Sequence, residues 1–248
     1  MYFNCNFSLD HYFQVLDHAK KSYSIGPIKD FYELQKKEKF LVVRHDVDVS
    51  IDKALEMARL EAQHGIVSTY FILLHSQYYN ALAKYNIEKI KQFLELGHEI
   101  GLHYDLTFVN SNDKILDMVI QEAQILGNLI DYKISSIAPH NVSLANMRIT
   151  YDHVNFIDAT DPKILRSVKY ISDSVQNWRS GCMCNHIDNE SKLIILTHPI
   201  WWMKNHTSRE EILAKFEINQ IETIKKLLNE TKQAHLSYFN KLETGKIS

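Results

Sequence analysis

The amino-acid sequence predicts an α/β fold, and within this class an incomplete (β/α) barrel that forms a single domain over residues 1–248. Short apolar runs of strand length alternate with amphipathic stretches of helix length, a pattern typical of parallel sheets with helical crossovers. Six or seven such runs suit a barrel of this length better than an open sheet, which remains the alternative. The 7 glycines and 4 prolines are too few for a flexible linker between two domains.

Residues 1–38 are predicted to form a helical extension that precedes the first strand. Apolar residues recur at helical spacing between Ser8 and Ser22, and Ser8 is a suitable N-cap. A Gly-Pro pair at residues 26–27 then breaks the helical pattern. A short helix is expected to follow it and to reach about Lys36. We expect this extension to plug or flank the fold.

The first predicted strand, residues 40–43, leads into the most informative stretch of the chain. Its four consecutive large apolar residues indicate a strand that is covered on both faces. Asp46 and Asp48 follow two positions apart, so in an extended chain both carboxylates point to the same side just beyond the strand. The alternative is that one of them caps the next helix, although Ser50 is already a good N-cap there.

The rest of the chain continues the alternation of helices and strands. Helices are predicted over residues 50–64, 86–96 and 113–129, with Gly65 and Gly97 ending the first two, and a capping box at residues 208–211 begins a long last helix. Strands are predicted over residues 67–74, 99–103, 134–138 and 192–197, with shorter candidates at residues 154–159 and 168–172.

Histidines follow the ends of four predicted strands. These residues are His45, His103, His140 and His198. Because the carboxyl ends of parallel strands converge, we expect them to form one site with Asp46 and Asp48, although a single histidine at such a position more often has a structural role. Histidine and carboxylate ligands without thiolate suit zinc or a similar divalent ion, whose bound water is a nucleophile at neutral pH. A remaining carboxylate would act as general base and a histidine as general acid, which predicts amide or ester hydrolysis.

Other notable residues carry weaker predictions. Cys5, Cys182 and Cys184 cannot all pair within the chain and indicate a reducing compartment. The stretch over residues 182–186, Cys-Met-Cys-Asn-His, resembles half of a zinc site, but no second Cys/His pair follows at usable spacing, so we expect a plain surface loop. His98 is expected to point away from the face that His103 occupies.

Composition and charge exclude several classes of partner. The formal net charge is −2 and the lysines are scattered, so we expect neither nucleic acid nor acidic lipid as a partner. No apolar run approaches the roughly 18 residues that a membrane span needs, and the N-terminus lacks the pattern of a signal peptide. A cytoplasmic location is the resulting expectation.

Three motifs together resemble a known family. Residues 44–48 (Arg-His-Asp-Val-Asp), 97–103 (Gly-His-Glu-Ile-Gly-Leu-His) and 196–199 (Leu-Thr-His-Pro) are similar in order and spacing to those of the NodB-like polysaccharide deacetylases, the carbohydrate esterase family 4 type. The His-Asp-Val-Asp opening and the His-Pro-x-Trp-Trp ending resemble the subgroup often found in bacterial surface-glycan gene clusters. The resemblance covers about residues 40–202 and implies a distorted (β/α) barrel. It also implies metal-dependent removal of an acyl group from an acylamino or acyloxy sugar.

The resemblance also implies roles for individual residues. Asp46 matches the catalytic base of the family, Asp48 its metal-binding aspartate, His103 its first metal-binding histidine and His198 its catalytic acid. The second metal-binding histidine of the family falls at Thr107, a poor zinc ligand.

This departure leaves the third metal ligand open. We expect His140 to supply it, with Asp105 as the alternative; otherwise metal binds weakly or not at all. Asp173 and Trp178 match a region that orients the acid and lines the site. The Trp201-Trp202 pair either packs in the core or forms an apolar platform beside a sugar ring. The residues expected to contact or surround the substrate are His45, Asp105, Asn141, Asp173, Trp178, Trp201 and Trp202.

The leading functional hypothesis is a zinc-dependent hydrolase that removes an acetyl or formyl group from a sugar. Its substrate would be a small sugar, a nucleotide sugar or a lipid-linked saccharide, a precursor in surface-glycan biosynthesis. Two alternatives remain open. One is a non-catalytic saccharide-binding domain on a degraded deacetylase scaffold, and the other is a hydrolase of small non-sugar amides.

Overall fold

The computed structural model describes residues 4–108, 111–140 and 155–243. Its contacts divide the chain into two compact units, residues 1–206 and residues 207–248. The first unit contains the sheet, both apolar clusters described below and the candidate site. The second contains one long helix, α7 (Arg209–Glu243), in which the backbone N–H of Glu211 donates to the Ser208 hydroxyl, as the capping box predicts.

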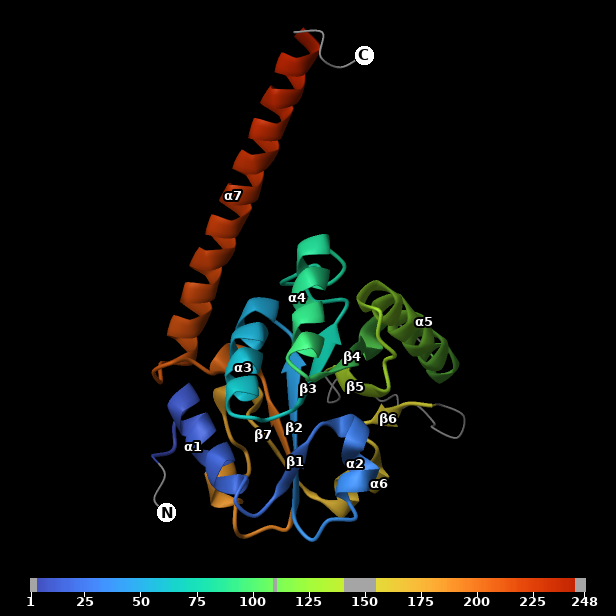
Figure 1. Ribbon diagram of the computed structural model, residues 1–248, viewed down its shortest axis with the longest axis vertical. Helices are drawn as coiled ribbons and strands as arrows, with labels where there is room; N and C mark the ends of the chain where they lie inside the picture. The colour runs from blue at the N-terminus through green and yellow to red at the C-terminus, as the bar shows by residue number, and fades with distance from the viewer. Residues whose placement is uncertain (1–3, 109–110, 141–154, 244–248) are drawn as a thin grey trace. The chain divides into compact units, whose positions relative to one another are not determined.

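All strands of the first unit belong to one parallel sheet, which is curled into a half-barrel (Figure 1). The strand order is β6-β5-β4-β3-β2-β8-β7, and β1 pairs with the first half of β2. No pairing joins β6 to β7 among the described residues, so the barrel is incomplete. The strands are β1 (Ser24–Gly26), β2 (Phe40–Val47), β3 (Thr69–Leu73), β4 (Glu99–Asp105), β5 (Ser136–His140), β6 (Ile157–Asp158), β7 (Lys169–Ser172) and β8 (Lys192–Thr197).

In the described part of the chain, one α-helix precedes β1, and α-helices connect β1 to β2, β2 to β3, β3 to β4, β4 to β5 and β6 to β7 (Figure 1). They are α1 (Leu9–Ala19), α2 (Phe31–Leu34), α3 (Ile51–Gln63), α4 (Lys84–Glu95), α5 (Asn112–Ile130) and α6 (Pro162–Ser167). Ser8 and Ser50 accept hydrogen bonds from the backbone N–H groups of His11 and Lys53, so the predicted N-caps of α1 and α3 are confirmed. Gly65 ends α3 in the left-handed conformation, with φ of 64°.

The core lies on both faces of the sheet. One apolar cluster packs strands β2 to β5 against α3, α4 and α5, and a second packs β2 against α2 and α6. Phe40 and Val42 belong to the second cluster, and the intervening Leu41 is also fully buried. The prediction of a strand covered on both faces is therefore confirmed.

Three details of the fold differ from the sequence-based expectation. β2 continues through Val47, so Asp46 lies within the strand rather than beyond it. β1 was not expected, because three residues give no periodicity, and it is held only by pairing with β2. α6 was not expected either; Asp161 caps it and proline occupies its first turn. In the described part of the chain, no helix is both long and apolar enough to cross a membrane.

Candidate active site

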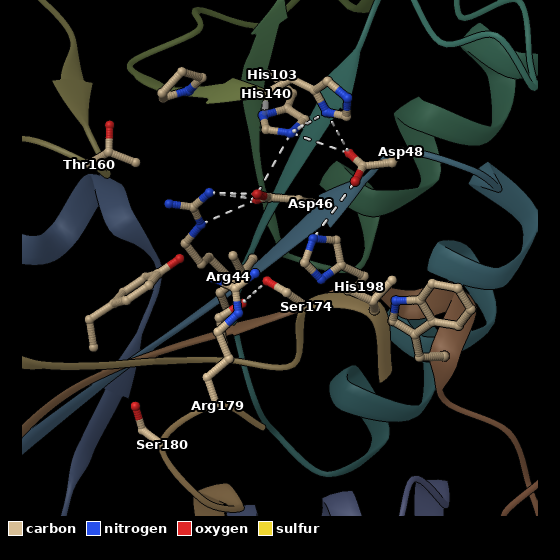
Figure 2. A pocket seen from close by; sticks show the side chains of 16 residues that line it. Arg44, Asp46, Asp48, His103, His140, Thr160, Ser174, Arg179, Ser180 and His198 are labelled. Carbon is tan, nitrogen blue, oxygen red and sulfur yellow. Dashed lines mark hydrogen bonds and ion pairs between the residues drawn. The ribbon is translucent and has the colours of Figure 1, made fainter. Parts of the chain in front are cut away.

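The carboxyl ends of β2, β4, β5 and β8 meet at one cavity of about 560 Å³ (Figure 2). Parallel pairing of neighbouring strands brings these ends together although they are far apart in the sequence. The lining residues are Arg44, Asp46, Asp48, His103, Pro139, His140, Thr160, Tyr170, Ser172, Ser174, Val175, Arg179, Ser180, Leu196, His198 and Trp201.

Three potential ligand atoms form a nearly equilateral triangle in this cavity. His103 Nε2 lies 3.2 Å from Asp48 Oδ1, His140 Nδ1 lies 3.4 Å from the same oxygen, and the two ring nitrogens are 3.4 Å apart. Ligands bonded at about 2.0–2.1 Å in a tetrahedral zinc site lie about 3.3 Å from one another. The triangle therefore has the dimensions of one face of a zinc coordination shell.

The protonation of His103 follows from its second contact. Its Nδ1 lies 2.8 Å from the carbonyl oxygen of Ala138, which can only accept, so Nδ1 carries the proton and donates it. In the neutral ring Nε2 then presents a lone pair to Asp48 Oδ1, a buried oxygen that has no hydrogen-bond partner among the described residues. Either a proton on Nε2 or a metal cation must therefore lie between these two atoms, and the donor set suits a divalent metal.

The charges around Asp48 keep it ionised. Burial by itself would raise the pKa of Asp48, but the contacts with His103 and His140 and the nearby His198 hold the pKa well below its usual value. The pKa of His103 moves the other way: burial would lower it, but Asp46 and Asp48 raise it. This region of the cavity therefore favours bound positive charge.

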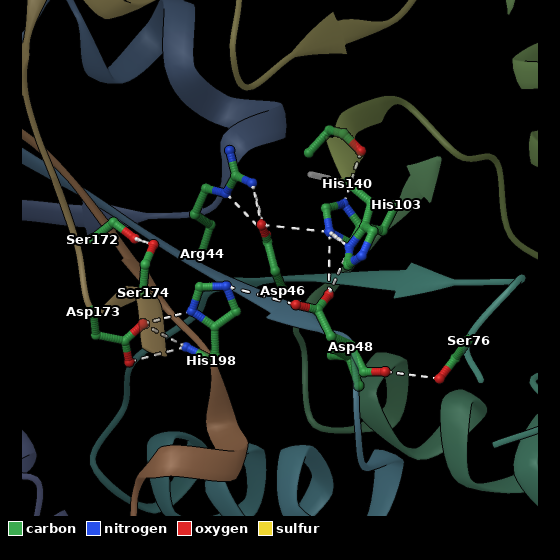
Figure 3. A network of polar contacts seen from close by, with 12 residues as sticks. Arg44, Asp46, Asp48, Ser76, His103, His140, Ser172, Asp173, Ser174 and His198 are labelled. Carbon is green, nitrogen blue, oxygen red and sulfur yellow. Dashed lines mark hydrogen bonds and ion pairs between the residues drawn. The ribbon is translucent and has the colours of Figure 1, made fainter. Parts of the chain in front are cut away.

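Asp46 lies beside the triangle and is held by an arginine on the same strand (Figure 3). Arg44 Nη2 donates to both oxygens of Asp46 at 2.7 Å, and Arg44 Nε donates to Oδ1 at 3.2 Å. Burial would raise the pKa of Asp46, but Arg44 and then His103 lower it overall. The guanidinium lies over the Phe71 ring, 4.8 Å from its centroid, and Gly101 leaves room for that ring because a Cβ there would lie 2.4 Å from it.

His198 reaches the cavity on the other side of Asp48 (Figure 3). Its Nε2 lies 3.7 Å from Asp48 Oδ2, and its Nδ1 donates to the fully buried Asp173 at 2.6 Å. Burial would lower the pKa of His198, but Asp173 and then Asp48 raise it to about 9. Trp202 Nε1 donates to the other oxygen of Asp173 at 2.7 Å and so fixes its orientation. His198 is therefore protonated at neutral pH, with Nε2 directed into the cavity.

Of the expected substrate contacts, the structure places only Trp201 on the cavity wall. Asp173 and Trp202 lie behind His198 and position it, as described above. Asn141 lies outside the described residues.

The structure corrects the expected convergence of all four strand-end histidines, because His103, His140 and His198 line the cavity and His45 does not. Successive side chains of a strand point to opposite faces, so Arg44 and Asp46 reach the cavity and His45 does not. His45 is fully buried, with Nδ1 lying 2.6 Å from the Thr197 hydroxyl and Nε2 lying 2.9 Å from Glu61 Oε1.

Asp105 and Trp178 also lie outside the cavity lining. Asp105 Oδ1 accepts hydrogen bonds of 2.8 Å from the backbone N–H and the hydroxyl of Thr107, so this carboxylate is occupied locally. Trp178 stacks on Phe7, with ring centroids 5.9 Å apart, and contacts Trp202 edge to face. Neither residue lines the cavity, and substrate contact by either stays a prediction.

Sequence reasoning missed several residues of the site. Arg44 is part of the quoted motif, and its position two residues before Asp46 was a signal that the pair shares a face. Tyr170 and Arg179 carry no such signal, because β7 and the segment after Trp178 meet the cavity only through the folded chain. Glu61 does not line the cavity, but it was detectable as a carboxylate among the buried positions of α3.

Comparison with known proteins gives matches only at the level of structure. No family model matches the chain, and no curated protein matches it. A variant of the peptidoglycan deacetylase PdaC from Bacillus subtilis aligns with a TM-score of 0.46 at 14% identity, covering 81% of this chain and 98% of that one. A family 4 acetyl xylan esterase from Clostridium thermocellum, in complex with cobalt, has a TM-score of 0.45 at 14% identity, covering 74% and 83%.

A CE4 family pseudoenzyme from Bacillus anthracis also matches, with a TM-score of 0.41 at 16% identity, covering 76% of this chain and 62% of that one. The matches thus include both enzymes and a pseudoenzyme. The chain is similar in structure to CE4 proteins, at an identity too low to carry over an activity.

Proposed function

We propose that the protein is a divalent-metal-dependent hydrolase that removes an acyl group, acetyl or formyl, from an amino or acylated sugar. The observation that carries this proposal is the triangle of Asp48, His103 and His140, flanked by Asp46 and by His198. Such a set provides a metal site, a carboxylate base and a protonated histidine in one cavity.

Asp48, His103 and His140 would hold the metal ion, which when bound supplies Lewis acidity toward the acyl carbonyl and toward water. Asp46 would accept the proton of the attacking water; in support, its Oδ2 lies 3.7 Å from His103 Nε2, at the edge of the triangle. Arg44 keeps the Asp46 carboxylate ionised and oriented until it takes up that proton.

His198 is placed to give a proton to the departing amine or hydroxyl. Its Nδ1 is held by Asp173, so the proton that it can release is the one on Nε2, which faces the cavity. Separate acid and base groups suit acyl transfer, because the water must lose a proton and the sugar nitrogen or oxygen must gain one.

The cavity wall fits a saccharide with an anionic part. Trp201 and Tyr170 line this wall, and aromatic side chains are suited to contact with a sugar ring. Arg179 is exposed at the same wall, and a guanidinium is well suited to a phosphate. These residues support a nucleotide-linked or lipid-linked sugar as substrate, which would place the reaction in surface-glycan biosynthesis.

The test pairs metal binding with activity in matched variants. Wild-type protein, stripped and reloaded with zinc, is titrated beside His140→Ala and the control Asp105→Ala, and release of acetate or formate is measured from acylated amino sugars, their nucleotide-linked forms and simple amides. We expect His140→Ala to lose metal affinity at this site, and we expect Asp105→Ala to retain it.

Three outcomes would contradict the proposal. Unchanged affinity in His140→Ala would remove it from the ligand set. Metal binding without turnover of any acylated compound would favour the non-catalytic saccharide-binding alternative. Turnover of simple amides alone would favour the hydrolase of non-sugar amides.

A further inference from the structure

A second group of potential metal ligands lies where the N-terminal segment meets the loop before β8. It consists of Cys5, His11, Cys182 and Cys184, whose ligand atoms all lie within 4.8 Å of one another. None of the four lines the cavity of the candidate active site. The three cysteines are all that the sequence contains, and they converge although 179 positions separate Cys5 from Cys184.

Local structure holds the two halves of this cluster in place. Ser8 caps α1 by accepting from the N–H of His11, which puts that ring in the first helical turn. The N–H of Leu9 donates to the carbonyl of Met203 at 2.8 Å. This contact fixes the start of α1 beside the last residues of the first unit, residues 1–206. On the other side, Gly181 adopts φ of 86° and turns the chain into Cys182.

The separations of the ligand atoms are compatible with one tetrahedral ion. Cys5 Sγ lies 3.0 Å from Cys184 Sγ, His11 Nε2 lies 3.1 Å from Cys182 Sγ, and all remaining separations are within 4.8 Å. In a tetrahedral site with zinc–sulfur bonds of about 2.3 Å, sulfurs lie about 3.8 Å apart and a ring nitrogen lies about 3.5 Å from each sulfur. Shifts of less than about 1 Å at side-chain termini would therefore close the shell.

The burial of the cluster suits a structural site. His11, Cys182 and Cys184 are 2%, 6% and 8% exposed, whereas Cys5 is exposed and closes the group from outside. Structural zinc sites use four protein ligands, with Cys₃His among the common sets, and leave no open position.

We propose that Cys5, His11, Cys182 and Cys184 form a structural Zn²⁺ site that fastens the N-terminal segment to the loop before β8. The ligand is a thiophilic divalent cation, and the thiols lose their protons to solvent as they bind it. The site is distinct from the triangle of Asp48, His103 and His140, which has no sulfur ligand.

Two other roles for the cluster fit the structure less well. A disulfide between Cys5 and Cys184 requires a bond of about 2.05 Å, against a separation of 3.0 Å, and would leave His11 and Cys182 without a common function. A catalytic thiol must be reached by substrate, whereas Cys182 is buried and lies outside the cavity of the candidate active site.

The experiment separates this site from the active site by its sulfur ligands. Full-length protein is purified under reducing conditions, stripped and reloaded with cobalt, and its absorption spectrum is recorded. We expect a sulfur-to-cobalt charge-transfer band in wild type, and we expect the same band in a double variant, His103→Ala with His140→Ala, which lacks the active-site ligands. Zinc analysis should then give about one ion per chain for that double variant.

Variants of the cluster supply the control. Cys5→Ser, at the exposed ligand, should lower zinc affinity and weaken the band. His186→Ala should change neither, because His186 Nε2 donates to the Ser180 carbonyl at 2.8 Å and takes no part in the cluster. Absence of the band in wild type would overturn the proposal even if the variants failed to fold. A metal-free protein whose mass shows a Cys5–Cys184 disulfide would overturn it as well.

Discussion

Asp46 and Asp48 are two positions apart on one strand end, but their neighbours differ. Asp46 is bound by the guanidinium of Arg44, whereas Asp48 faces the ring nitrogens of His103 and His140. An arginine cannot give up its proton, so Asp46 stays a hydrogen-bonded carboxylate, while Asp48 is available to a metal. Two aspartates can therefore have different roles, because their neighbours differ.

The separation of roles predicts that Asp46→Asn retains metal and loses turnover. The amide is nearly isosteric but cannot take a proton from water, so we expect kcat to fall by about 10²- to 10⁴-fold. Zinc content and kcat are measured together, with Asp52→Asn as control, since Asp52 is exposed on α3 and pairs with Lys89. Near wild-type kcat in Asp46→Asn would show that the carboxylate has only a structural role.

Glu61 is a second buried carboxylate, and it stabilises the fold behind the site. Its oxygens accept from the hydroxyls of Tyr12, Ser68 and Tyr70 and contact His45 Nε2. Burial would raise the pKa of Glu61, but His45 and these hydrogen bonds lower it from 4.5 to about 2. A lowered pKa means that the ionised form stabilises the fold above about pH 4.5 and that this stabilisation is lost as pH falls toward 2.

We therefore predict that Glu61→Gln destabilises the protein at neutral pH by an amount on the order of 3 kcal/mol. The difference in free energy of unfolding between wild type and Glu61→Gln should shrink between pH 4.5 and pH 2. Denaturant titrations at several pH values measure it, and Glu56→Gln, on the exposed side of the same helix, is the control. A difference that did not vary with pH would contradict the assignment.

At the scale of elements, the loop after β7 combines strain with a place at the cavity. Val175 lines the cavity and adopts φ of 57° and ψ of 39°, the left-handed region that β-branched residues avoid. The loop also carries Asp173, which orients His198. The strained segment thus carries both a residue of the cavity wall, Val175, and the carboxylate that orients His198.

Replacing Val175 by asparagine should stabilise the protein by about 1 kcal/mol, because asparagine tolerates the left-handed region. Val175→Ala is the control, since alanine keeps the penalty of a Cβ at positive φ. Denaturant unfolding compares the two variants with wild type. Equal stabilisation by both would show that side-chain loss, not backbone strain, is responsible.

Elements with a strong local sequence pattern were predictable, and elements that depend on distant partners were not. β8 was predicted with the bounds that the structure shows, because its apolar run is long and uninterrupted. β1 exists through its pairing with β2, which the sequence does not display. For the site, convergence of strand ends predicted the meeting of His103, His140 and His198 with Asp48.

The residues that sequence analysis missed reach the site through tertiary structure. Arg179 meets the cavity from a loop without periodicity. Likewise, Cys5 and His11 approach Cys182 from the opposite end of the unit, so a search for downstream ligands could not find them. Spacing rules apply to ligands close in sequence and fail for pairs that the fold assembles.

At the scale of the molecule, the two units differ in what they contain. Both apolar clusters and every described residue of the candidate site lie within residues 1–206. We predict that a chain ending at residue 216, which keeps the capping box of α7, retains a cooperative unfolding transition with a free energy changed by less than about 1 kcal/mol. Circular dichroism and denaturant unfolding measure this, and a non-cooperative transition would contradict it.

The pairing of β2 with β8 has a consequence for how the chain is made. His45 and Thr197 contact each other across 152 positions of sequence, so β2 leaves the ribosome long before its neighbour exists. At about 5–20 residues per second, the delay is roughly ten seconds or more. During this time the nascent chain exposes one side of β2, and with it an unpaired strand edge that invites wrong association. Chaperone contact with the nascent chain should therefore concentrate in that interval of synthesis and end when β8 has emerged.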